Sequence, residues 1–286
     1  MMQQATSIRI QSTVHRTVAV LEVLVVFQVT FTLIWLLALL PVSKIEQNFL
    51  GYFVMISFPL LIILVTRRDL KAYGLSFQRT KEQLNMTMAV FPVYALHGAI
   101  TGWLLPELLP HASIRWEGAL IHILVWVPFF FWTAWILRKL PTTALVMPAF
   151  LCVFPLVQGS AVLPERLVSF VFYLMFLGPG EEFLFRGYIQ SRLNAAFGRP
   201  FKFWGVSYGW GLVITSLIFG VMHFLNPFNP FLGKFDLYIW WGVWTVLGGL
   251  SMGYIREKAG SILPSAILHG SPQAIASLFF GFFAGV

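Results

Sequence analysis

The sequence predicts an all-α protein, a polytopic transmembrane helical bundle, on three observations. Hydrophobic residues make up 58% of the 286 residues and charged residues only 10%, whereas soluble domains carry about 25% charged residues. The apolar residues gather in runs of about 20, the length with which a helix crosses the hydrocarbon core. Most basic residues lie in the short segments between these runs. This pattern excludes an ordinary water-soluble domain.

Nine apolar runs, separated by short polar loops, are candidate spans. They cover residues 17–40, 49–66, 84–105, 118–137, 142–162, 167–190, 208–230, 237–255 and 261–285. The run 142–162 contains Pro148 and Pro155, and 167–190 runs into charged residues, so we expect about eight or nine spans. The first run is too long for the apolar part of a signal peptide and is expected to remain as a helix.

The distribution of lysine and arginine predicts the orientation. With a cytoplasmic N-terminus, fifteen of these residues fall in inside loops and four outside, which follows the positive-inside rule. Loops 67–83 and 138–141 are then expected to face the cytoplasm. The net charge of +8 is explained by this topology, and no nucleic-acid partner is expected. We expect an integral, multi-pass protein of the lipid bilayer, in the plasma membrane if the cell is prokaryotic.

Two adjacent glutamates, Glu181 and Glu182, interrupt an apolar run, and Arg186 follows them. Ionisable groups at membrane depth are costly and by default mark a functional site. On a helix, Glu182 and Arg186 are four residues apart and share a face, whereas Glu181 is rotated by about 100°. Arg186 is therefore expected to neutralise Glu182 and to leave Glu181 without a local cation. Pro179 and Gly180 suit a helix start or a kink just before the pair.

Two further apolar runs carry polar side chains that point to chemistry. One contains Phe219 and His223 at a spacing of four, and the last run contains His269 and Gln273 at the same spacing. A water-activating site within the membrane is expected to combine such groups: one free acid, one acid held by arginine, two histidines and an amide. Here they lie on three spans. By contrast, Glu22 lies near the start of the first span and is expected to reach the headgroups.

These three motifs, Glu181-Glu182-x-x-x-Arg186, Phe219-x-x-x-His223 and His269-x-x-x-Gln273, resemble the signature of the CPBP intramembrane proteases. That family includes the CAAX prenyl endopeptidases of the Ras-converting type and bacteriocin-processing and self-immunity proteins. The resemblance covers about 179–273. It implies a catalytic transmembrane core in 161–286 and generic spans in 1–160. The third motif departs from the family, which usually has asparagine where this chain has Gln273.

The resemblance implies an intramembrane endopeptidase that hydrolyses a peptide bond of a membrane-associated or prenylated protein or peptide. Glu181 and His223 would activate water, and His269 and Gln273 would stabilise the oxyanion. Glu182 and Arg186 would support the site as an ion pair. The departure at Gln273 keeps open a catalytically silent scaffold or bacteriocin-immunity factor. A proton-coupled transporter is a further alternative, although no internal repeat is visible. The oligomeric state is not predicted.

The resemblance also raises the question of a metal. Zinc or another divalent ion could take Glu181, His223 and His269 as ligands, since histidine and carboxylate groups bind zinc. The sequence lacks the His-Glu-x-x-His spacing of many zinc proteases. We therefore favour a mechanism without a cofactor, in which Glu181 is the general base.

Overall fold

The computed structural model describes the chain except residues 1, 77, 101–115, 140–162 and 281–286. Among the described residues before 140, the long helices are α1 (Met2–Leu37), α2 (Lys44–Val65), α3 (Thr80–Ala99) and α5 (Trp116–Lys139). After 162 come α6 (Leu163–Phe172), α7 (Gly178–Glu182), α8 (Gln190–Phe197), α9 (Trp210–Phe224), α10 (Ile239–Ala259) and α11 (Leu263–Phe280). Short 3-10 turns, η1 (Leu70–Tyr73) and η7 (Pro230–Leu232), lie in connections.

The structure supports an integral membrane protein. Among the described residues, three helical stretches are long and apolar enough to cross a membrane: Thr13–Leu37, Lys44–Val65 and Glu165–Phe197. Helix α9 is apolar but has 15 residues, shorter than the predicted run 208–230, because the chain turns at Leu225 ahead of Pro227. The predicted span 142–162 and most of the loop 138–141 lie outside the described residues. The total of eight or nine spans stays a prediction.

One element departs from the all-α prediction. Strands β1 (Phe201–Phe203) and β2 (Val206–Tyr208) form an antiparallel hairpin after α8. Its turn residues Trp204 and Gly205 both have positive φ, the conformation that suits the right-handed twist of a tight hairpin. The alternation of aromatic and polar residues in 201–208 is the signal for these strands, and a search for apolar runs does not detect it.

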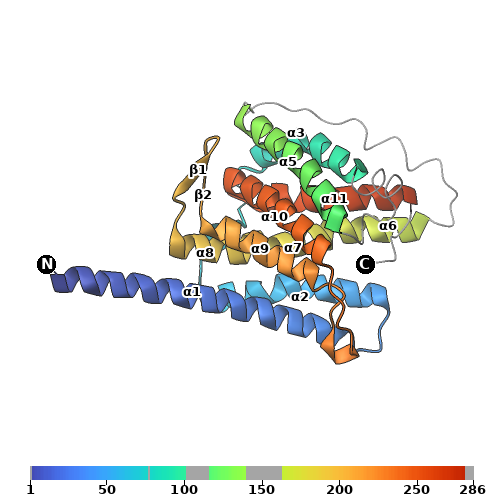
Figure 1. The fold of residues 1–286 in the computed structure, drawn as a ribbon. Coiled ribbons are helices and arrows are strands. Elements are labelled where there is room, and N and C mark those ends of the chain that lie inside the picture. The colour runs from blue at the N-terminus through green and yellow to red at the C-terminus, as the bar shows by residue number, and fades with distance from the viewer. Residues whose placement is uncertain (1, 77, 101–115, 140–162, 281–286) are drawn as a thin grey trace.

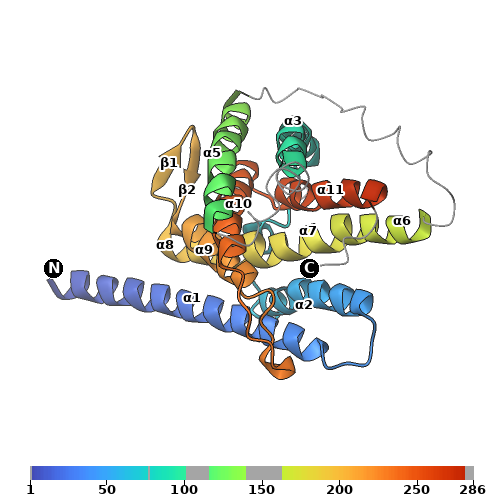
Figure 2. The same ribbon diagram turned by 45° about the vertical axis from the view of Figure 1, so that its right-hand side comes forward.

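The helices pack in layers that place the C-terminal part of the chain in the middle (Figures 1 and 2). Helices α1 and α2 lie side by side along one side of the molecule, and α3 and α5 lie on the opposite side. Between them run α6–α8 and, packed against these, α9–α11. Residues of the middle helices are therefore covered from both sides.

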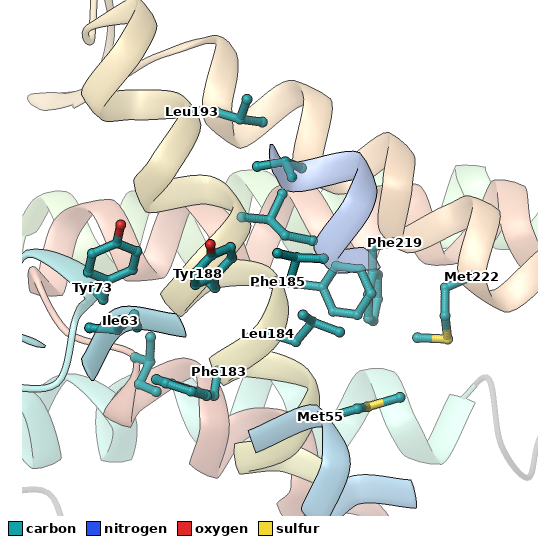
Figure 3. Packing of buried hydrophobic residues seen from close by; sticks show 14 residues of the cluster. Met55, Ile63, Tyr73, Phe183, Leu184, Phe185, Tyr188, Leu193, Phe219 and Met222 are labelled. Atoms are coloured by element: carbon teal, nitrogen blue, oxygen red, sulfur yellow. The ribbon is translucent and has the colours of Figure 1, made fainter. Parts of the chain in front are cut away.

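The largest apolar cluster joins the N-terminal helices to this middle layer. Figure 3 shows Phe185 and Phe219 facing each other, with Met55 from α2 and Met222 from α9 nearby. The rings of Phe185 and Phe219 make an edge-to-face contact with centroids 4.9 Å apart. Helices α1 and α2 thus form part of the same core as the polar motifs of α7 and α9.

A polar network ties α1 to the middle layer, and it corrects the expectation for Glu22. Instead of reaching the headgroups, the Glu22 carboxylate accepts hydrogen bonds from Arg68, from Arg192 at 2.9 Å and from the Tyr188 hydroxyl at 2.6 Å. These donors come from the loop after α2 and from the α6–α8 stretch, so only the folded chain brings them together. The bond to Glu22 raises the pKa of Arg68 above its ordinary value.

Candidate active site

Glu181 and Glu182 lie in the middle of a continuous helical run from Leu163 to Phe197. Two π-helical segments flank them, η5 (Tyr173–Leu177) and η6 (Phe183–Ile189). Of the two alternatives predicted at Pro179 and Gly180, a helix start or a kink, the start does not hold, because the helical run continues through both residues. The wide turn of η5 comes where the proline ring would otherwise meet a carbonyl one turn earlier, so the helix continues through Pro179. Such π segments are frequent at functional sites.

Close helix packing places α11 against the two glutamates. A side chain at Gly178 would collide with the carbonyl oxygen of Ala266, and one at Gly270 would collide with the carbonyl oxygen of Tyr173. Glycine at both positions lets the backbones of α7 and α11 approach closely. His269, next to Gly270, is thereby brought beside Glu181 and Glu182.

The predicted pair of Glu182 with Arg186 is confirmed. Arg186 Nη1 donates to Glu182 Oε1 at 2.8 Å, and both side chains are fully buried. Arg186 Nη2 also donates to the carbonyl of Gly249 on α10, and the guanidinium lies 4.3 Å from the ring centre of Phe219. Arg186 is one of the fifteen basic residues that the charge count assigns to inside loops, but its side chain is fully buried within the bundle.

His269 from α11 joins this pair. Its Nδ1 lies 2.9 Å from Glu182 Oε1, and since a carboxylate oxygen only accepts, the ring donates. The other nitrogen, Nε2, lies 3.5 Å from Glu181 Oε2. Glu182 therefore fixes the orientation of the His269 ring and aims its second nitrogen at Glu181, an arrangement that a carboxylate commonly provides for a functional histidine.

His223, at the end of α9, faces the same carboxylate from the other side. Its Nδ1 lies 3.0 Å from the carbonyl oxygen of Phe219 and donates to it, which leaves Nε2 as the acceptor of a neutral ring. That Nε2 lies 4.0 Å from Glu181 Oε2. The Phe219 ring packs on His223 and His269, with centroid distances of 4.4 and 5.8 Å, and separates the two imidazoles from the apolar core.

Glu181, like its neighbour Glu182, has one carboxylate oxygen without a hydrogen-bond partner among the described residues, but the partners of its bonded oxygen are different. The side chain is buried, and Oε1 accepts a hydrogen bond from the hydroxyl of Tyr52 at 3.2 Å. Among the described residues, Oε2 has no hydrogen-bond partner, although Nε2 atoms of two histidines face it. As predicted, Arg186 pairs with Glu182 and not with Glu181.

Gln273 is placed differently from the other five predicted residues. It lies one helical turn after His269 on α11, and its side chain is exposed. No hydrogen bond of its amide to another described residue is present. The structure thus brings together Glu181, Glu182, Arg186, His223 and His269, and leaves Gln273 at the edge of the cluster.

The described residues do not offer a ready metal site. No three histidine, cysteine, aspartate or glutamate side chains among them are arranged to hold a metal ion. Among the candidate donors, Glu181 Oε2 lies 4.0 Å from Nε2 of His223 and 3.5 Å from Nε2 of His269. Ligands of one zinc ion, each about 2.0–2.2 Å from the metal, lie at separations of this order, so a mechanism without a metal stays a prediction, and it is the one followed below.

Sequence reasoning missed Tyr52 as a member of this cluster. Tyr52 belongs to a span that reads as generic, and a tyrosine among Phe49, Phe53 and Phe58 gives no polar signal of its own. A hydroxyl among several phenylalanines on one span is the one feature that could have drawn attention to it.

The fold and the site define a helical membrane protein with a cluster of acids and histidines buried in its core. Residues 163–275 match the family described as type II CAAX prenyl endopeptidase Rce1-like. This match confirms the resemblance to the CPBP/CAAX protease family that the three motifs predicted. No curated protein and no solved structure matches the chain.

Proposed function

We propose that the protein is an intramembrane endopeptidase in which Glu181 and His223 activate a water molecule. The observation that carries this is the unbonded Glu181 Oε2, which lies 4.0 Å from the acceptor nitrogen of His223. A separation of this size suits a water that hydrogen-bonds to both atoms. A buried carboxylate with one oxygen open to such a water can serve as a general base.

The reaction proceeds by attack of this water on the carbonyl carbon of the scissile peptide bond. Glu181 accepts a proton as the new carbon–oxygen bond forms, and the carbonyl oxygen becomes an oxyanion. When the carbon–nitrogen bond breaks, the proton on Glu181 passes to the leaving nitrogen. The products are a carboxylic acid and an amine; a proton then passes from the acid to the amine to give the carboxylate and the ammonium, and Glu181 is again ionised.

His269 is the principal donor to the oxyanion in this proposal. Because Nδ1 already donates to Glu182, Nε2 can donate only if the ring carries both protons. The carboxylates of Glu181 and Glu182 carry two negative charges, and the guanidinium of Arg186 carries one positive charge. A protonated His269 supplies the second positive charge and makes the cluster neutral. A preorganised charged donor of this kind stabilises the oxyanion by about 3–4 kcal/mol.

Gln273 would add a second donor. It shares a face of α11 with His269, but its amide must turn inward from its exposed position to reach the oxyanion. Glutamine is one methylene longer than the asparagine usual in the family, which gives it that reach. The same departure supports the second candidate function, a catalytically silent scaffold or immunity factor.

The substrate that we propose is a membrane-associated or prenylated protein or peptide. We also propose that the N-terminus lies in the cytoplasm. The buried site is reached from the bilayer more readily than by a soluble protein, and the family description names prenylated CAAX substrates. Cysteine labelling at exposed positions of 67–83 from outside intact cells tests the orientation. Labelling of these cysteines from outside intact cells would contradict the cytoplasmic position of the loop.

An unbiased comparison of cleaved peptides tests the function. Membrane-protein termini are compared in cells with the native protein, with Glu181→Gln, and with Glu165→Gln as a control on an exposed acid of the same helical run. We expect a set of termini that disappears in Glu181→Gln and persists in Glu165→Gln. Identical termini in all three favour the silent scaffold.

A further inference from the structure

Tyr52 on α2 is the described residue that hydrogen-bonds Glu181. The two residues are 129 positions apart, and the hydroxyl lies 3.2 Å from Glu181 Oε1. Tyr52 lies outside the stretch 163–275 that matches the protease family, in the part of the chain read as generic spans. A residue of the N-terminal half thus reaches the most reactive group of the proposed site.

Packing alone does not explain a tyrosine at this position. The ring of Tyr52 makes an edge-to-face contact with Phe172, with centroids 5.4 Å apart. One turn earlier on α2, Phe49 makes the same kind of contact with Phe172 and Phe176 and needs no hydroxyl. The phenol oxygen is needed only for its hydrogen bond to Glu181.

The backbone of the active-site helix is shaped to accept Tyr52. A side chain at Gly180 would lie 3.0 Å from Cδ1 of the Tyr52 ring and 3.4 Å from its carbonyl oxygen. Such a contact is tighter than most packing contacts of a side chain, so a residue other than glycine at 180 would require Tyr52 to shift by a few tenths of an ångström. The ring is therefore held between Gly180 and Phe172, with its hydroxyl at Glu181.

The hydrogen bond fixes which oxygen of Glu181 does the chemistry. A carboxylate with neither oxygen held can rotate about its last torsion and exchange its two oxygens. Because Tyr52 holds Oε1, Oε2 stays directed at the Nε2 atoms of His223 and His269. A base held in one orientation loses less freedom on reaching the transition state.

We propose that Tyr52 is a positioning residue for Glu181. Its hydroxyl holds the Glu181 carboxylate, and helix α2 thereby contributes a residue to the active site. This inference rests on the proposed function only where it concerns catalysis. Its structural part, that Tyr52 holds the Glu181 carboxylate, is tested separately. Tyr52→Phe removes the hydroxyl and keeps the ring against Gly180 and Phe172.

The structural part is tested by chemical labelling of Glu181 in purified protein. The probe is dicyclohexylcarbodiimide, an apolar reagent for buried carboxyls, and the modified residue is identified by mass spectrometry. We expect several-fold faster labelling of Glu181 in Tyr52→Phe, because Oε1 is no longer held. Tyr254→Phe is the matched control, since it removes a buried tyrosine hydroxyl bond of the same 3.2 Å length at Phe203. Equal rates in the native protein and Tyr52→Phe overturn the inference.

The catalytic part is tested on a substrate found by the comparison of cleaved peptides. We expect Tyr52→Phe to lower kcat about tenfold, as for one hydrogen bond to a charged group, with KM unchanged. A purely structural role would lower Tm and leave the kcat of the folded protein at its native value. If Glu181→Gln is inactive and Tyr52→Phe has native kcat, the positioning role fails and the proposed function stands. If Glu181→Gln is fully active, the proposed function fails, and the labelling rates still decide whether Tyr52 holds Glu181.

Discussion

Two of the carboxylate clusters that tie the described helices together, those of Glu22 and Glu181, differ in how fully their oxygens are bonded. Glu22 has donors on both oxygens, from two arginines and a tyrosine. Glu181 has a tyrosine on one oxygen, and its other oxygen has no hydrogen bond among the described residues. Both clusters join helices far apart in the sequence, so connectivity does not distinguish them.

In the proposed function, this difference separates a carboxylate that supports the fold, Glu22, from one that takes part in the chemistry, Glu181. A carboxylate with every lone pair occupied, beside two cations, has no position left for a reacting water. A buried carboxylate with one open oxygen costs stability, because a buried acceptor without a donor is expensive. A fold retains such a group where it is used, and stored cost of this kind gathers at functional sites.

The largest effect is expected from replacing Glu181, whose Oε2 has no hydrogen bond among the described residues. Glu181→Gln should lower kcat by about 10²–10⁴-fold with little loss of folded protein, because the amide keeps the shape and cannot accept the proton. Turnover of an identified substrate and Tm are measured beside Glu165→Gln, which should match the native protein. A misfolded Glu181→Gln would mean that Glu181 belongs with Glu22 as a structural acid.

A second large effect is expected at the neighbouring acid. Glu182→Gln leaves Arg186 as a buried charge with a weakened partner and removes the acceptor that orients His269. We expect a loss of about 3–5 kcal/mol in the free energy of unfolding, together with lower activity. Titration with SDS in mixed micelles measures it. A stable and fully active Glu182→Gln would reverse the roles assigned to the two glutamates.

Gln273 tests whether the oxyanion has one donor or two. Gln273→Ala should lower kcat by about 10²-fold, the cost of removing one such donor, and Gln273→Asn should retain or raise activity. Both variants are assayed at saturating substrate. An unchanged kcat in Gln273→Ala would remove this exposed residue from the site and leave His269 as the named donor.

A smaller effect, on stability alone, is expected at Glu22, whose two oxygens both accept hydrogen bonds. Glu22→Gln should lower the free energy of unfolding by about 1–2 kcal/mol, because it weakens charge-assisted bonds that are only partly buried. The kcat of the folded fraction should stay unchanged. Glu82→Gln, which breaks an exposed pair with Arg79, is the control and should change stability by less than about 0.5 kcal/mol. A lower kcat in Glu22→Gln would link the two clusters.

No effect is expected from removal of divalent metal. If Glu181 and His223 activate water without a metal, cleavage should survive exhaustive chelation of purified protein. Metal content is measured alongside activity. A stoichiometric zinc ion that is lost and restored together with activity would instead make ligands of Glu181, His223 and His269.

The sequence by itself determined the class of protein and the local part of the site. Composition and run length indicated membrane-spanning helices, and the spacing of Glu182 and Arg186 predicted their ion pair, because residues four apart on a helix share a face. The three motifs also led to the family that matches 163–275. These features depend on neighbours in the chain, which helical periodicity places.

Only the tertiary structure decided which partners the remaining polar groups have. The bonds from Tyr52 to Glu181, from His269 to Glu182 and from Arg192 to Glu22 each join separate helices. They depend on how closely those helices pack, which glycines such as Gly178 and Gly180 control. Helical periodicity gives the face on which a side chain lies but not the helix that covers that face, so the long-range partners of Glu22 and Glu181 could not be predicted from the sequence.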